Sequence, residues 1–335
     1  MSERERLFKQ FDALNVESFE DFSLELFRYQ SKYNLIYKKY IDALNINPNS
    51  IDDLRSIPFL PIEFFKQHKI VSNSAELSQD ELVFESSGTG SGLTSKHYLS
   101  NLNHYLKHAQ HIFESFYGRL EDYIILALLP SYLERKGSSL VAMVDDFIKK
   151  TNSPESGFYL YDLKELVGKV KELKKNSSTK KVIVWGVSFA LLELAENFKV
   201  DFSGCIVMET GGMKGRRKEM TRDELHTIFC EGLNIDKVHS EYGMTELLSQ
   251  SYSMGHGTFQ PSHSMKVLAR EVNDPFEIKL FDTRSSGLNV VDLANIDSCA
   301  FIETQDVGLV NEDGSFQVLG RLDNSDIRGC NLMVY

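Results

Sequence analysis

The stretch YIILALL, residues 123–129, decides the fold more than any other part of this 335-residue sequence. Its apolar and aromatic residues run without interruption to Pro130, a pattern typical of a strand buried on both faces of a parallel sheet. Two comparable strands follow, VIVWG at 182–186 and CIVME at 205–209. Helical periodicity separates and flanks these strands, over residues 101–117, 139–149, 162–175, 188–198 and 221–230. The alternation predicts an α/β fold, with a largely parallel sheet covered by helices.

The two ends of the chain have hydrophobic patterns that differ from that of the middle. Apolar residues recur every three or four positions over residues 3–45, which predicts helix. After residue 260 the pattern changes to short alternating strands, with a tight turn at 311–314. We therefore predict a small antiparallel β subdomain beside the α/β body. The predicted division is an α/β core with its helical N-terminal segment over 1–260, a small β-rich subdomain over 261–325 and a C-terminal tail over 326–335.

Composition excludes several classes of protein. Hydrophobic residues make up 42% and charged residues 25%, which is ordinary globular usage. The net charge of −11 argues against nucleic-acid binding. The sequence has no run of eighteen apolar residues, so we expect no membrane span. Its charged start has no apolar region of the kind found in secretory signals. The four cysteines, Cys205, Cys230, Cys299 and Cys330, form no CxxC pair, which favours a reducing compartment and predicts a cytoplasmic protein.

A run of small hydroxyl residues and glycines follows a short strand at 81–85. The run, SSGTGSGLTSK at 86–96, leaves several backbone N–H groups close together, as polyphosphate binding requires. It is neither a Walker A motif nor GxGxxG. A flexible turn is the alternative.

Two further motifs combine polar groups at strand ends. In EYGMTE at 241–246, after a predicted strand at 237–240, a hydroxyl and a carboxylate stand side by side at Thr245 and Glu246. The hydroxyl can bond a phosphate and the carboxylate can hold Mg²⁺, although an ordinary strand-to-turn link is possible. Asp306 and Arg321 can converge across a hairpin on a ribose diol, or simply form an ion pair.

Taken in order, these motifs resemble the adenylate-forming superfamily, which includes acyl-CoA ligases and firefly luciferase. Within it the sequence resembles the acyl-protein synthetase (LuxE-type) family, with phenylacetate–CoA ligases as relatives. The resemblance is carried by IPFLPI at 57–62 with Phe65-Lys66, SSGT at 86–89, ETGGMKGR at 209–216, EYGMTE at 241–246 and RGC at 328–330. It implies the fold of the large N-terminal domain of adenylate-forming enzymes.

The resemblance also implies ATP and Mg²⁺ as cofactors, with a role for each matching residue. Thr245 would contact the α-phosphate, Glu246 would ligate Mg²⁺, and Asp306 would hold the ribose with help from Arg321. Tyr242 would stack on adenine in the same motif as Gly243, and Gly211 and Gly212 would flank the base. The β- and γ-phosphates would be cradled by Ser86, Ser87, Gly88, Thr89, Gly90 and Ser91.

The implied reaction is acyl transfer in two steps, from a fatty or other carboxylic acid. The acid forms acyl-AMP from ATP, and a thiolate then displaces AMP. Full-length members of the superfamily continue into a mobile domain that carries a catalytic lysine. Because fourteen residues follow Arg321 here, we expect that domain to be absent.

Without that domain, other residues must take over its two tasks. Cys330 would accept the acyl group and pass it to a protein partner such as a reductase or transferase, and Arg328 would lower its thiol pKa. One of Lys214, Arg216 and Arg217 can replace the charge of the missing lysine, and a solvated loop is the alternative explanation of these residues. The alternatives are an acyl-CoA ligase and a non-catalytic nucleotide-binding subunit of an acyl-transfer complex.

Two other patterns have ordinary explanations. His104, His108 and His111 share one helix face at a spacing that can bind metal, but no carboxylate accompanies them, so we expect a polar or packed face. The WGVS stretch at 185–188 either lines an acyl pocket or is a plain strand–helix turn.

Overall fold

The computed structural model describes residues 1–72, 82–86, 93–130, 137–160, 162–176, 179–198, 200–211 and 220–322. Structural statements below refer to these residues. Several predicted site residues lie outside them: Ser87, Gly88, Thr89, Gly90, Ser91, Gly212, Lys214, Arg216, Arg217, Arg328 and Cys330. The predicted tail over 326–335 also lies outside them.

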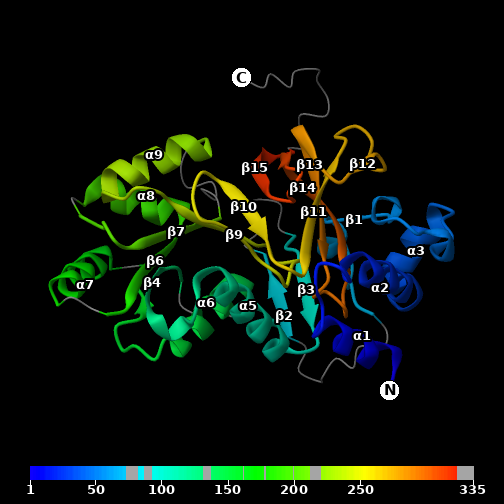
Figure 1. Ribbon diagram of the computed structural model, residues 1–335, viewed down its shortest axis with the longest axis horizontal. Coiled ribbons are helices and arrows are strands. Elements are labelled where there is room, and N and C mark those ends of the chain that lie inside the picture. Colours follow the sequence, from blue (N-terminus) through cyan, green and yellow to red (C-terminus); the bar gives the residue numbers. More distant parts are fainter. Residues whose placement is uncertain are drawn as a thin grey trace.

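The predicted parallel sheet is present and confirms the fold class. Strands β4 (Tyr123–Leu128), β6 (Lys181–Val187), β7 (Ile206–Thr210) and β8 (His239–Tyr242) lie side by side in parallel, with β5 (Gly157–Phe158) beyond β4. The helices around them are α5 (Leu102–Tyr117), α6 (Ser139–Lys150), α7 (Leu163–Lys175), α8 (Ser188–Asn197) and α9 (Arg222–Leu233). Figure 1 shows this α/β region on the left of the molecule.

Two neighbouring residues of β6 show how the sheet is covered. Trp185 is completely buried against Phe113 of α5 and Phe147 of α6. Its neighbour Gly186 faces Leu191 of α8. Because successive side chains of a strand point to opposite faces, α5 and α6 lie on one face and α8 on the other. Trp185 is therefore a core residue, which favours the plain strand–helix turn at 185–188.

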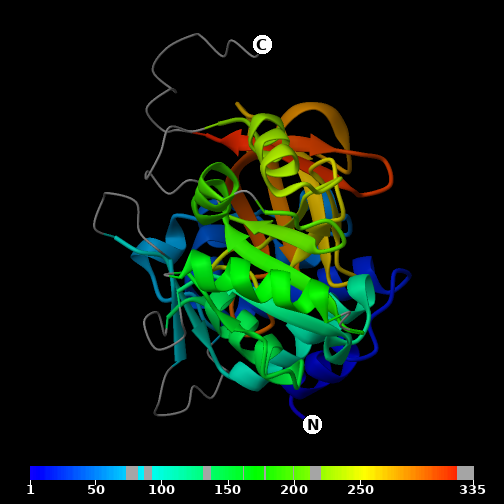
Figure 2. The ribbon, with the colours of Figure 1, turned by 90° about the vertical axis from the view of Figure 1, so that its left-hand side faces the viewer.

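The sheet does not stop at β8 but continues into the antiparallel part (Figure 2). Strand β9 (Ser251–Ser253) pairs with β8, and β10 (Thr258–Pro261) pairs with both β9 and β15 (Phe316–Arg321). The remaining strands in order are β14 (Phe301–Val310), β13 (Asp282–Asp292), β11 (Met265–Arg270) and β12 (Ile278–Lys279). The antiparallel β region is thus present, and the division at residue 260 remains a prediction.

Three shorter strands complete the described structure. Strand β1 (Leu60–Pro61) pairs in parallel with β14, and β2 (Leu82–Glu85) forms a separate hairpin with β3 (Lys96–Leu99).

The strand predicted at 237–240 is shifted to His239–Tyr242, because the charged and polar residues at 241–242 are buried here and extend the pairing.

The N-terminal helical segment consists of three helices rather than one. Helices α1 (Glu3–Phe11), α2 (Phe19–Tyr33) and α3 (Leu35–Ala43) precede the single turns η1 (Pro48–Ser50), η2 (Leu54–Ser56), α4 (Phe64–Gln67) and η3 (Leu120–Asp122). Phe27 of α2 and Tyr37 of α3 pack on Phe301 of β14, which fixes this segment against the antiparallel strands. Among the described helices, none is long and apolar enough to cross a membrane.

Close packing of β14 on β15 allows a direct test of the fold. A Cβ on Gly308 would lie 1.9 Å from the carbonyl oxygen of Gln317, so Gly308→Ala must force the two strands apart. We expect the free energy of unfolding to fall by about 2 kcal/mol in urea denaturation. Gly320→Ala is the matched control, because nothing lies within 4 Å of its Cβ position. Equal stability of the two variants would contradict this packing.

Candidate active site

The site is built at the carboxyl edge of the parallel strands. Strands β7 and β8 end side by side, with Thr210 opposite Glu241, and their turns begin at Gly211 and Gly243. This edge is where α/β folds bind ligands. The Thr210 hydroxyl donates to the Glu241 carboxylate, while the Ser188 hydroxyl contacts Glu209 and the Gly211 carbonyl. The predicted residue Gly211 is therefore held in place at this edge.

Glu241 explains why a glycine follows Tyr242. A Cβ at position 243 would lie 2.4 Å from Oε1 of Glu241, so any other residue there would displace the Glu241 carboxylate from its bond with Thr210. Burial raises the pKa of the Glu241 carboxyl to about 7, against the opposing hydrogen bond from Thr210. The sequence motif contained Glu241, but its burial was not predicted.

Asp306 and Arg321 form the ion pair that was one of the two expectations for them, and Tyr242 joins this pair through a contact that the sequence did not predict. The Tyr242 hydroxyl donates to Asp306 Oδ2 over 2.8 Å, and Arg321 Nε donates to Asp306 Oδ1 over 3.0 Å. Asp306 and Arg321 are directly opposite each other on β14 and β15. The ordinary ion pair is therefore present, and its carboxylate lies against the tyrosine at the end of β8. The rings of Tyr242 and Phe316 also pack against each other in a T-shaped arrangement.

The β2–β3 hairpin brings Ser86 and Ser95, which flank the undescribed residues 87–92, to the same edge. Ser86 N donates to the carbonyl of Ser95, and Ser95 N donates to Ser86 Oγ over 2.9 Å. The Ser95 side chain hydrogen-bonds Glu246. His97 Nδ1 lies 2.9 Å from the Thr245 carbonyl, which only accepts, so this nitrogen carries the proton. The structure thus places Ser86, Thr245 and Glu246 in one neighbourhood.

Glu246 is a suitable carboxylate for a divalent cation. It is only 5% exposed, and burial raises its pKa, while the Ser95 hydrogen bond and the charges of Arg321 and Lys66 oppose that rise. It forms no ion pair with any described residue at contact distance. A carboxylate oxygen so placed fits the oxygen ligation that Mg²⁺ prefers.

Lys66 is a site residue to which the sequence analysis gave no role. It belongs to α4, where its neighbour Phe65 packs edge-on against the His97 ring. Its charge acts on Glu246 together with that of Arg321. Lys66 is exposed and pairs with no described acidic residue. The only sequence signal was its place beside IPFLPI at 57–62, because its charge acts on Glu246 from a segment far away in the sequence.

The three helical histidines form a packed face, as expected. The His104 and His108 rings contact Phe11 of α1, and His111 contacts His263. His108 Nε2 also hydrogen-bonds Ser249 and Ser264. Within the described ranges, no group of three or more His, Cys, Asp or Glu residues is arranged to hold a metal ion.

Comparison with known proteins gives structural relatives only. No family model and no curated protein matches the sequence. Among solved structures, ATP-bound MatB from Rhodopseudomonas palustris is similar with a TM-score of 0.51 and 15% identity, over 71% of this chain and 47% of that one. The structure of McyG A-PCP complexed with phenylalanyl-adenylate is similar with a TM-score of 0.52 and 14% identity, over 84% and 51%.

A third structure has a bound metal. O-succinylbenzoate coenzyme A synthetase (MenE) from Bacillus subtilis, in complex with ATP and magnesium ion, gives a TM-score of 0.51 at 14% identity, over 75% of this chain and 53% of that one. The likeness shows a shared fold. The chain spans about half the length of these structures.

The buried histidines predict how stability depends on pH. Burial lowers the pKa of His97 and of His239 to about 4 each, whereas both ionise near 6.5 in the unfolded chain. Between pH 6.5 and 4 the unfolded chain binds more protons at these groups, so they lower stability as the pH falls. The raised pKa of Glu241 acts in the opposite direction between pH 7 and 4.5.

A variant isolates the contribution of His97. His97→Gln keeps a donor for the Thr245 carbonyl but does not titrate. In urea denaturation between pH 7 and 4.5, we expect the stability advantage of the wild type over the variant to shrink as the pH falls. An advantage that is constant with pH would contradict the buried, neutral state of His97.

Proposed function

We propose that this protein activates a carboxylic acid with ATP, forming an acyl adenylate and pyrophosphate. One observation carries the proposal. The buried Glu246 carboxylate, the Tyr242–Asp306–Arg321 chain and the closed base of the Ser86–Ser95 hairpin meet at the carboxyl edge of a parallel sheet. These are the groups that a magnesium-bound nucleotide requires. The shared fold with ATP-bound and adenylate-bound structures supports this.

Each residue has a chemical task in this proposal. Asp306 keeps lone pairs free beside its two protein partners and accepts from the ribose hydroxyls. The Thr245 hydroxyl donates to the α-phosphate. The substrate carboxylate oxygen attacks the α-phosphorus, and the bond to pyrophosphate breaks. Lys66 and Arg321 offset the charge that develops on the phosphate oxygens. Mg²⁺ held by Glu246 would supply further neutralisation of that charge.

We further propose transfer of the acyl group to the Cys330 thiolate, as in an acyl-protein synthetase acting on a fatty acid. The thiolate attacks the acyl carbonyl, a C–S bond forms, and the C–O bond to AMP breaks. The other cysteines support this choice by elimination. Burial raises the pKa of the thiols of Cys205 and Cys230, and that of Cys299 to about 12. None of the three is a ready thiolate at neutral pH.

Pyrophosphate exchange tests the first step. We expect carboxylate-dependent exchange between ATP and pyrophosphate, screened over a panel of short and long acids. Glu246→Gln and Lys66→Gln should each lower the exchange rate by about 100-fold, since each removes a charge at the phosphates. Lys38→Gln is the matched control, because Lys38 is an exposed lysine of α3 and is not among the cations that act on Glu246.

Two results decide the outcome of this experiment. No exchange with any acid would contradict acid activation and favour the non-catalytic nucleotide-binding subunit. An unchanged rate in Lys66→Gln would exclude that residue from the chemistry.

Retention of labelled acyl groups tests the second step. Cys330→Ala should form acyl-AMP at the wild-type rate but lose the radiolabelled acyl group that stays on denatured protein. Cys230→Ala, which removes a half-buried thiol on α9, should retain it. Label that persists on Cys330→Ala would contradict the thiol acceptor. Consumption of acyl-AMP that depends on added coenzyme A would favour the acyl-CoA ligase instead.

A further inference from the structure

The segment that carries Thr245 and Glu246 has little secondary structure of its own. Residues 243–250, between β8 and β9, belong to no helix or strand, and the backbone bond from Leu247 N to Met244 O is their turn contact. Yet Glu246, Leu247 and Ser249 are almost completely buried. Buried backbone groups need partners, so the shape of this segment must be set by groups outside it.

Asp292, at the end of β13, supplies the first set of partners. It is completely buried, and its Oδ2 accepts from Leu248 N over 2.7 Å and from Ser249 N over 3.0 Å. Its Oδ1 accepts from the Ser249 hydroxyl over 2.6 Å and from Ala294 N over 3.2 Å. One carboxylate thus fixes two consecutive N–H groups that follow Glu246 by two and three residues.

Asn295, three residues later, holds the other side. Its Nδ2 donates to the Glu246 carbonyl over 2.9 Å, and it is completely buried. Its own carbonyl accepts from Gln30 Nε2 of α2 over 2.7 Å. The position of Asn295 is therefore fixed by the N-terminal helices, and Asn295 in turn fixes the backbone of Glu246.

A second layer supports this arrangement. The Ser249 hydroxyl lies 2.9 Å from His108 Nε2 and 2.9 Å from the Ser264 hydroxyl. His108 belongs to α5, and its ring packs on Phe11 of α1. The histidine face that the sequence singled out thus packs against the support of this segment, through Ser249.

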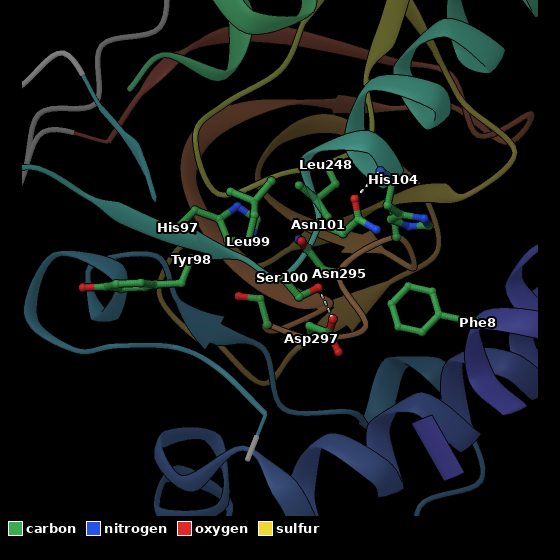
Figure 3. A pocket seen from close by; sticks show the side chains of 12 residues that line it. Phe8, His97, Tyr98, Leu99, Ser100, Asn101, His104, Leu248, Asn295 and Asp297 are labelled. Carbon is green, nitrogen blue, oxygen red and sulfur yellow. Dashed lines mark hydrogen bonds between the residues drawn. The ribbon is translucent and has the colours of Figure 1, made fainter. Parts of the chain in front are cut away.

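The cavity beside this segment is too small for a substrate. It is lined by Leu248, Asn295, His97, Asp297, Phe8 and their neighbours, and has a volume of about 20 Å³ (Figure 3). That volume accommodates one water molecule. Oδ1 of Asn295 has no hydrogen-bond partner among the described residues and is itself buried. The segment therefore has a structural support on this side rather than a ligand.

We propose that Asp292 and Asn295 are positioning residues, which hold the 245–249 backbone so that the Thr245 hydroxyl and the Glu246 carboxylate meet the magnesium nucleotide in fixed orientation. The inference rests on the proposed function. Supports of this kind matter because a misplacement of about 1 Å at a reacting centre lowers the rate about 100-fold.

A pair of asparagine variants tests the inference. Asn295→Asp keeps the shape of the side chain but removes the donor to the Glu246 carbonyl. Asn34→Asp is the matched control: Asn34 is also completely buried and donates to a backbone carbonyl, that of Ser298, over 3.0 Å. Both variants put an acid beside a buried carbonyl, and Asn295→Asp also puts it 3.5 Å from Asp292 Oδ2, so both should lower global stability. Asp292→Asn, which places an amide against the Leu248 and Ser249 N–H groups, provides a second variant.

Two measurements separate positioning from stability. Hydrogen exchange is compared at the same free energy of unfolding for each variant. In peptides that span 243–250, we expect the amides of Asn295→Asp and Asp292→Asn to exchange at least tenfold faster than those of Asn34→Asp. In calorimetric titration with MgATP, we expect their dissociation constants to rise about tenfold, with Asn34→Asp like the wild type. Both changes together support the inference.

Each remaining outcome refutes a definite statement. Exchange like that of the control would overturn the support of the segment by Asp292 and Asn295. Faster exchange with unchanged MgATP affinity would overturn their role in the site. A wild type that does not bind MgATP at all would refute the proposed function and, with it, this inference, although the exchange measurement would still report on the support of the segment.

Discussion

The hydrogen bond from Tyr242 to Asp306 joins the two halves of this molecule at the place where the chemistry is proposed. Tyr242 ends the last parallel strand, and Asp306 lies in the middle of the antiparallel β14. The bond forms because β9 and β10 carry the sheet from β8 across to β15 without a break. Arg321, on the neighbouring strand β15, donates to the same Asp306 carboxylate. A site shared between the two regions depends on this continuity.

The second constraint is the burial of polar groups around this edge. Glu241, Glu246 and Asp306 are all less than a tenth exposed, although carboxylates are rarely buried without partners. Each has one: Thr210 for Glu241, Ser95 for Glu246, and Tyr242 with Arg321 for Asp306. Polar groups that are already held by the protein need little rearrangement when a charged ligand arrives. The packing around the site therefore preorganises its polar groups for a charged ligand.

Sequence patterns predicted the parts of the structure that depend on local periodicity. Uninterrupted apolar runs predicted β4, β6 and β7, because strands buried on both faces must be apolar throughout. The motifs predicted that Asp306 and Arg321 converge, but not that the Tyr242 hydroxyl donates to Asp306. By contrast, β9 reads Ser-Tyr-Ser, and nothing in those residues predicts a buried strand that links the two sheets.

The residues that were missed act through contacts between distant segments. Lys66 reaches the site because Phe65 packs on His97, and Asn295 reaches it because its side chain bonds the Glu246 carbonyl. The spacing of residues in a single sequence predicts neither of these contacts. The prediction of helix over 3–45 did not include the breaks between α1, α2 and α3: Asn34 caps α3 with its own side chain, and the periodicity continues across that break.

The central claim is that a carboxylate oxygen attacks the α-phosphorus of ATP. Oxygen transfer tests this most directly, with an acid that contains ¹⁸O in both carboxylate positions and mass spectrometry of the nucleotide after a single turnover. The account predicts AMP with one ¹⁸O atom, because the attacking oxygen stays on phosphorus when the acyl group leaves. Unlabelled AMP, or ADP with labelled phosphate, would contradict it.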